Sequence, residues 1–244
     1  MIHLTPMEVA TFAATFVRTA AWIQTAPIVG DQTTPRRVRG GAAVLIAMAL
    51  LPGRPPVSPE TIWFVLPGEL LIGICIGMVA RILMAGIEAG GQIIGVEMGL
   101  NFGGQFDPVL RDEANPVHRI FHIVGSLVFL SAGGINSSVR ALSAATVSGR
   151  TLRIAASGMV ESSSQVLELA LRASAPMLVA ATITRLAAGM ASRAAPAFNV
   201  FSVMLSMMAV LGGLVLLATG PAFFREVSLA VHRSMGAMTQ MATP

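Results

Sequence analysis

Charged side chains are scarce in this chain of 244 residues, of which 11% are charged and 54% are hydrophobic. The mean hydropathy of +0.74 lies far outside the usual balance of a soluble domain of this length, so the composition places the chain in or against a membrane. Lysine and tyrosine are absent, and the 16 basic residues are all arginines that are scattered along the chain. Proteins that bind nucleic acid gather basic and aromatic residues on one surface. Nucleic acid is therefore not an expected partner.

Motifs of catalysis and of cofactor binding are also missing. The sequence has no Gly-x-Ser-x-Gly elbow, no His-Glu-x-x-His helix, no Walker loop and no dinucleotide-binding glycine fingerprint. His118 and His122 are four residues apart, which puts two possible metal ligands on one helical face, but no cysteine or carboxylate accompanies them at ligand spacing. We therefore expect no catalytic residues, no cofactor and no metal. The single cysteine, Cys75, cannot form an internal disulfide and is expected to be a small buried apolar residue.

Apolar segments recur along the chain and predict an all-α fold of membrane-associated helical hairpins. The segments cover roughly residues 7–29, 38–52, 61–104, 118–148, 162–192 and 197–242, with breaks where proline, glycine and charge gather. One break is expected at 148–158, and Ser162 with Gln165 fits a capping box that opens the following helix. The first segment lacks a cleavage site after it, so we expect a retained helix rather than a signal peptide.

Few of these segments are long enough and apolar enough to cross a bilayer alone. A spanning helix needs about 20 apolar residues, and only the intervals 120–139 and 194–224 reach that length without Asp, Glu, Lys or Arg. The segment 61–104 is interrupted by Glu69, Arg81, Glu88 and Glu97. Each such charge costs on the order of 3 kcal/mol at the bilayer centre. Either these side chains form buried pairs within the chain, or several of them face other subunits or a water-filled path.

A row of glycines marks the end of the same segment. Its members are Gly91, Gly95, Gly99 and Gly103, and earlier pairs stand at 73/77 and 86/90. This spacing lets two helix backbones approach closely, at a cost of about 1 kcal/mol for each glycine in a helix interior. The stretch that follows, GGQFDPVLRDEANP, predicts a mobile loop with a turn at Asp107-Pro108. Phe106 in this loop either tucks into the nearest core or plugs an opening.

Three stretches of the sequence carry motifs that one known family shares. GQIIGVEMGLNFGGQFDP is similar to the family signature G-x-x-I-G-x-x-M-G-L-x-F followed by Asp-Pro. Near the start, AAWIQTAPIVGDQTTPRRVRGGAAVLIAMALLP has the family's aromatic helix, Ala-Pro, and arginines before the second apolar segment. Late in the chain, SRAAPAFNVF resembles the element A-R-x-A-P-x-x-N-x-F, carried by Arg193, Pro196, Asn199 and Phe201. Together these stretches resemble the FliR family of the flagellar type III export gate, and the resemblance covers nearly the whole chain.

The resemblance implies a non-enzymatic gate subunit that forms, with FliP and FliQ, the pore through which unfolded flagellar proteins cross the inner membrane. It implies that residues 1–150 look like FliP and residues 151–244 like FliQ. FlhB and FlhA are further implied partners, membrane lipid surrounds the subunit, and the implied location is the flagellar basal body in the bacterial inner membrane, with several passes.

The resemblance also assigns roles to residues. The plug loop that seals the resting pore corresponds to Gly103, Gly104, Gln105, Phe106, Asp107 and Pro108. Packing against neighbouring subunits is assigned to Gly91, Gly95, Gly99, Arg193, Pro196, Asn199 and Phe201.

Other readings stay open on the sequence alone. The near relative of a flagellar gate subunit is the corresponding subunit of a virulence injectisome. A small secondary transporter also has broken helices and carboxylates at mid-membrane. An intramembrane enzyme would need a nucleophile and a base, which the sequence does not provide.

Overall fold

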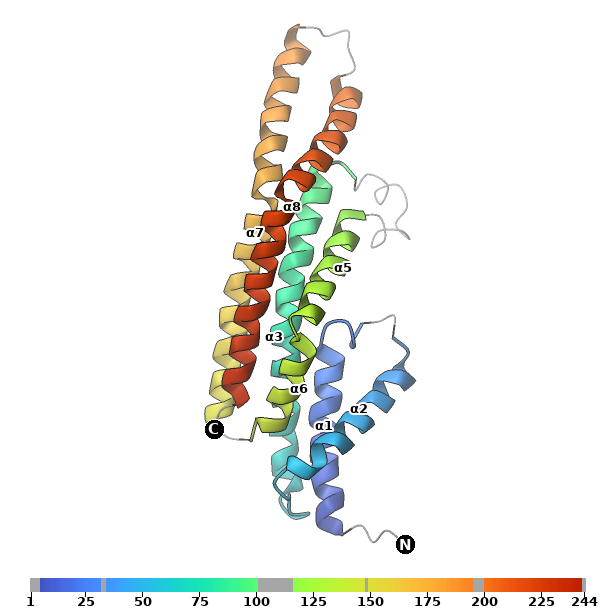
Figure 1. The fold of residues 1–244 in the computed structure, drawn as a ribbon, viewed down its shortest axis with the longest axis vertical. Coiled ribbons are helices and arrows are strands. Elements are labelled where there is room, and N and C mark those ends of the chain that lie inside the picture. Colours follow the sequence, from blue (N-terminus) through green and yellow to red (C-terminus); the bar gives the residue numbers. More distant parts are fainter. Residues whose placement is uncertain (1–4, 32–33, 101–115, 148, 195–199, 243–244) are drawn as a thin grey trace. The chain divides into compact units, whose positions relative to one another are not determined.

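The computed structural model describes residues 5–31, 34–100, 116–147, 149–194 and 200–242. Helices make up this part of the chain, and it contains no strand. Their order, shown in Figure 1, is α1 (Pro6–Thr25), α2 (Arg36–Leu50), the short 3-10 helix η1 (Leu51–Gly53), α3 (Ile62–Glu97), α5 (Pro116–Ser131), α6 (Gly134–Ala144), α7 (Gly149–Ala194) and α8 (Val200–Ala242). The predicted all-α class is confirmed.

The contacts divide the chain into two compact units. Unit 1 contains Met1–Leu83, Phe129–Ser164 and Val231–Pro244, and unit 2 contains Met84–Val128 and Gln165–Ala230. Helices α3, α5, α7 and α8 therefore contribute residues to both units.

Unit 1 is organised around α1, which begins at a complete capping box. The Thr5 hydroxyl accepts from the Glu8 backbone N–H, and the Glu8 carboxylate accepts from the Thr5 backbone N–H at 2.7 Å. The helix ends just before Pro27, because proline lacks the N–H that continues a helix. Helix α2 crosses α1 (Figure 1), and at the crossing the Thr19 hydroxyl donates to the Ala43 carbonyl at 3.1 Å.

The core of unit 1 lies where α3 crosses α1. Ile72, Ile76 and Val79 of α3 are buried there. The glycines Gly73 and Gly77 make the approach possible: a Cβ at Gly73 would strike the Arg18 carbonyl, and one at Gly77 would strike the Thr25 hydroxyl. The sequence predicted a close backbone approach at this glycine pair, and the helix that approaches is α1 of the same chain.

Unit 2 uses the next glycines of α3 in the same way. A Cβ at Gly86 or Gly90 would lie 3.0 Å from Val166 or Ala173 of α7, respectively. On another face, a Cβ at Gly91 would lie 2.7 Å from the Phe121 ring of α5. These distances are at or below the closest contacts that real side chains make, so α7 and α5 can approach α3 this closely only because α3 carries glycine there.

Two local predictions are wrong. The segment 118–148 is not one helix, because α5 ends at Ser131 and α6 begins after Gly133, whose φ is +80°. Glycine adopts this left-handed conformation without the steric penalty of a Cβ. The break at 148–158 is also absent, because α7 begins at Gly149. Ser162 lies inside α7 and donates to the Gly158 carbonyl at 2.7 Å instead of capping a helix.

The strict charge-free rule found two of the membrane-spanning candidates and missed two others. Three single helices are long and apolar enough to cross a membrane, at Ile62–Glu97, Ala156–Ala194 and Val203–Gly236, and the bent pair α5–α6 is a further candidate. The first two contain charged residues that the rule did not admit. Among the expected intervals, 194–224 overlaps the α8 candidate and 120–139 overlaps the bent pair.

Candidate functional site

A buried cluster of three charged side chains joins α1, α3 and the segment after η1 in unit 1. The Glu69 carboxylate accepts from Arg18 Nε at 2.5 Å through one oxygen and from Arg54 Nη2 at 2.6 Å through the other. The side chains of Arg18, Glu69 and Arg54 are only 0%, 3% and 5% exposed. One carboxylate therefore serves two buried guanidinium groups.

The same arginines hold the end of α6. Arg18 Nη1 donates to the carbonyls of Leu142 and Ala145, at 2.8 and 2.5 Å, and Arg54 Nη1 donates to the Ala145 carbonyl at 3.0 Å. The last carbonyls of a helix have no partner within the helix, so they need outside donors when they are buried. The cluster thus anchors the end of α6 to α1 and α3.

The cluster carries a net positive charge in a region that excludes water. Burial lowers the pKa of Arg18 to about 10, and the neighbouring Glu69 carboxylate opposes that shift. Arg18 Nη2 is buried and has no hydrogen-bond partner among the described residues. A charge excess of this kind is tolerated only where the remaining bonds fix the geometry well.

The other predicted buried charges lie in different surroundings. In unit 2, the Glu88 carboxylate lies 2.6 Å from His122 Nδ1 and is 28% exposed, and the Glu97 carboxylate lies 2.6 Å from Arg185 Nη2 and is 14% exposed. Arg81 is exposed, and no ion pair joins it to another residue that the structure describes. Glu69, Glu88 and Glu97 therefore each pair with a residue of the same chain. That Arg81 is buried by another subunit stays a prediction.

Possible metal ligands do not gather in the described part of the chain. No group of three or more His, Cys, Asp or Glu side chains there is placed to hold a metal ion. His122 forms the pair with Glu88 described above, and His118 Nδ1 lies 3.3 Å from the Glu88 backbone carbonyl. Both histidines thus join α5 to α3.

Several residues assigned by resemblance lie outside what the structure describes. The expected plug residues 103–108 belong to the segment 101–115, and Pro196 and Asn199 belong to 195–199, and neither segment is described. Arg193 is exposed in the last turn of α7, and Phe201 lies within α8. Gly91 and Gly95 are buried within α3, and Gly99 follows its end with a φ of +72°. Gly91 is covered by Phe121 of this chain, and contact of the row with another subunit stays a prediction.

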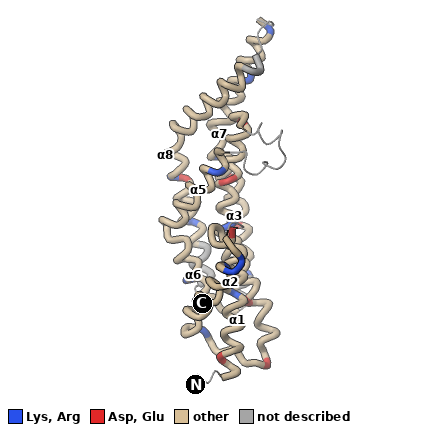
Figure 2. Tube along the Cα trace, turned by 90° about the vertical axis from the view of Figure 1, so that its right-hand side faces the viewer, with Lys and Arg blue, Asp and Glu red and all other residues tan. Residues whose placement is uncertain are grey.

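Large apolar side chains remain uncovered along the two longest helices. On α7 they are Val179, Ile183, Leu186 and Met190, and on α8 they are Val203, Met207, Val210, Leu214 and Leu217. Only 28% of the spanning window of α7 and 11% of that of α8 is buried inside the chain, against 56% for α3. The charged residues of α8 are Arg225, Glu226 and Arg233, so most of this helix is tan in Figure 2. An apolar face of this size needs lipid or a partner protein to cover it.

The chain matches a known protein family over most of its length. Residues 9–234 match the family described as "Bacterial export proteins, family 1". The chain belongs to this export family. The flagellar biosynthetic protein FliR of Caulobacter vibrioides is 29% identical over 225 residues, which cover 88% of this chain and 89% of that protein. The FliR proteins of Escherichia coli and Bacillus subtilis are 29% and 24% identical, over 76% and 79% of this chain and 74% and 79% of their own lengths.

Membership of the export family confirms the resemblance to FliR proteins and agrees with the apolar helices. The structure also changes how the charges of α3 are understood, because Glu69 and Glu97 pair with arginines of other segments. From the sequence, no role was predicted for Arg18, Arg54 or Arg185. The partner of Glu69 on α1 is 51 residues away, so no helical spacing pointed to it.

Proposed function

We propose that this chain is a non-enzymatic core subunit of the flagellar type III protein export gate. It forms, with FliP and FliQ, the pore through which unfolded flagellar proteins cross the bacterial inner membrane, and FlhB and FlhA contact the assembly. The observation that carries the proposal is the uncovered apolar surface of α8, of whose spanning window 11% is buried in the chain. Lipid covers part of such a surface, and sibling helices cover the rest.

The family relatives support the flagellar reading over the injectisome reading. The relatives from Caulobacter vibrioides, Escherichia coli and Bacillus subtilis are each named flagellar biosynthetic protein FliR. Within this proposal, residues 1–150 form a FliP-like part and residues 151–244 a FliQ-like part. Residues 103–108 obstruct the resting pore, and Gly91, Gly95 and Gly99 seat the helix before that loop.

Co-purification tests the proposal. The chain carrying an affinity tag is produced alone and together with FliP and FliQ of the same bacterium, and each sample is separated by size in mild detergent. We expect the chain alone to be recovered in low yield and to elute over a broad range of sizes, and the three proteins together to elute as one assembly. A solute transporter would instead purify alone as a monomer or simple dimer whose stability depends on its solute.

A pair of substitutions at one position sharpens this test. Leu214 of α8 is 62% exposed in the chain. Leu214→Glu puts an unpaired charge on the face that we propose is covered, which costs several kcal/mol where water is excluded, so co-purification should be lost. Leu214→Ala keeps the face apolar and should leave it intact. Equal recovery of both variants would overturn the proposal. A chain that is monodisperse alone and does not bind FliP or FliQ would also overturn it.

A further inference from the structure

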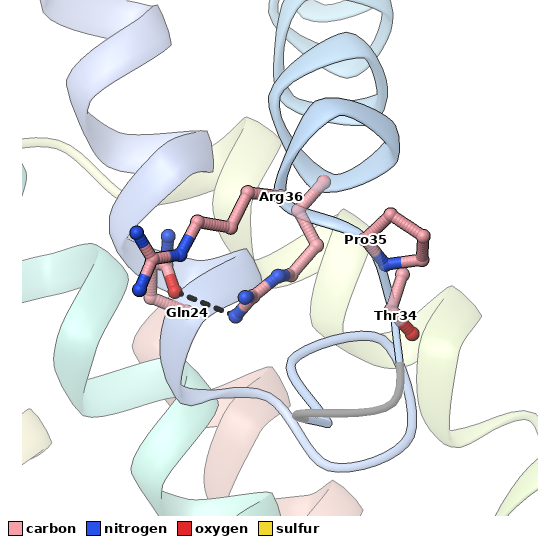
Figure 3. A pocket seen from close by; sticks show the side chains of 5 residues that line it. Gln24, Thr34, Pro35 and Arg36 are labelled. Carbon is pink, nitrogen blue, oxygen red and sulfur yellow. Dashed lines mark hydrogen bonds between the residues drawn. The ribbon is translucent and has the colours of Figure 1, made fainter.

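A cavity lies at the turn between α1 and α2, within unit 1. It has a volume of about 920 Å³ and is lined by Gln24, Thr34, Pro35, Arg36 and Arg39. Figure 3 shows the Arg36 side chain extending toward Gln24 of α1, with Thr34 and Pro35 on the segment that enters α2. None of its lining residues belongs to the buried charge cluster or to the residues proposed above for the pore.

No described residue neutralises the guanidinium groups at the cavity. Arg39 Nη1 donates to the neutral Gln24 Oε1 at 3.0 Å, and Arg39 Nε is buried with no hydrogen-bond partner among the described residues. Arg36 is exposed, and neither arginine forms an ion pair with a residue that the structure describes. Gln24 orients one guanidinium group without cancelling its charge.

The surrounding sequence increases the positive charge at this turn. Residues 9–59 contain five arginines and a single acidic residue, Asp31. Arg18 and Arg54 are bound to Glu69, which leaves three arginines at the start of α2. Helix α2 also begins after its N-cap residue Pro35 without a side-chain cap, so the positive end of its dipole faces the same turn. The cavity is thus suited to a group with net negative charge.

The outer face of α2 indicates where that group comes from. Val38, Leu45 and Met48 are 58%, 69% and 59% exposed, whereas the inner face of the helix is covered by α1. After Arg39, residues 40–50 form a run of 11 residues without a charge, which is about 16 Å of helix. This length is about half of a hydrocarbon core. The helix therefore fits one leaflet, with its arginines at the level of the headgroups.

We propose that this cavity binds the phosphate group of an anionic phospholipid, held by Arg36 and Arg39, while the apolar face of α2 contacts the acyl chains. Arginine binds phosphate through several donors in a fixed geometry. The lipid site does not depend on the pore assignment, because it is formed only by residues of unit 1. Arg36 and Arg39 are the side chains that bind the lipid.

Lipid retention in native mass spectrometry tests the proposal. The full chain in detergent is titrated with phosphatidylglycerol or with phosphatidylcholine, in the presence and absence of inorganic phosphate. We compare Arg36→Gln and Arg36→Gln/Arg39→Gln with Arg37→Gln, which removes the same charge from an exposed residue that does not line the cavity. Circular dichroism melting of each variant shows whether the fold is retained.

The wild-type chain should retain phosphatidylglycerol in preference to phosphatidylcholine. Because a basic residue near an anionic surface contributes about 1 kcal/mol, Arg36→Gln should weaken this binding about fivefold and the double variant about thirtyfold. Arg37→Gln should stay within about twofold of wild type, since its guanidinium group lies outside the cavity. An equal loss in Arg36→Gln and Arg37→Gln would show a general surface field and overturn the proposal. Absence of a preference for phosphatidylglycerol would do the same. A site for free phosphate would instead bind inorganic phosphate and retain neither lipid.

Discussion

Glu69→Gln should destabilise the chain far more than removal of either arginine that Glu69 binds. The substitution keeps the shape of the side chain but leaves Arg18 and Arg54 buried without a counter-charge. Breaking a buried ion pair by removing one partner costs about 3–5 kcal/mol, and here two guanidinium groups lose the same carboxylate. We expect a loss at the upper end of that range.

Arg18→Met should be milder, because the cluster then contains one arginine and one carboxylate. The Ala145 carbonyl keeps the hydrogen bond from Arg54 Nη1, and the Leu142 carbonyl loses its donor from Arg18. One unsatisfied buried carbonyl costs about 1–3 kcal/mol. The structure therefore predicts an order of damage, with Glu69→Gln above Arg18→Met.

Denaturant unfolding of the full chain in detergent, followed by tryptophan fluorescence, measures this order. Glu60→Gln is the matched control, because it makes the same chemical change at an exposed residue and should stay within about 0.5 kcal/mol of wild type. Equal losses for Glu69→Gln and Arg18→Met would refute the reasoning that charge balance, rather than the number of hydrogen bonds, holds the cluster together.

Two further predictions concern the glycines of α3 and α8 and the residues 104–108. Gly91→Ala should destabilise the chain by about 1–3 kcal/mol through overpacking against Phe121. Gly213→Ala is the control, because a Cβ at this position meets nothing within 4 Å, and it should stabilise α8 by up to about 1 kcal/mol. Equal thermal shifts of the two variants, measured on isolated chains, would contradict the packing argument. Deletion of residues 104–108 should increase the entry of small solutes into cells that contain the assembled gate, and unchanged permeability would count against a plug.

The sequence predicted those features of the fold that depend on local pattern. Apolar segments of the right length gave the helical class, and glycines at four-residue spacing predicted close helix approach, which occurs at Gly73 and Gly77 against α1. The capping box at Ser162 failed because the same residues suit the interior of a long helix, where a serine hydroxyl can bond the carbonyl four residues earlier. The actual capping box stands at Thr5.

The cluster around Glu69 could not be predicted, because its bonds join residues that are far apart in the sequence. Arg18 is 51 residues from Glu69 and 124 from Leu142, and no periodicity connects them. The same pairing explains why a charge-free window missed α3 as a spanning candidate. A charge that is neutralised by a neighbouring helix costs much less than one that faces acyl chains.

The sharing of one carboxylate by two arginines also constrains the order in which these positions can change by mutation. Loss of either arginine leaves a balanced pair that still folds, so a lineage can pass through that step. Loss of Glu69 first leaves two like charges enclosed together, and purifying selection should remove it. Neutral drift at this cluster should therefore begin at Arg18 or Arg54, and a replacement of Glu69 should be found only on a background in which an arginine has already gone.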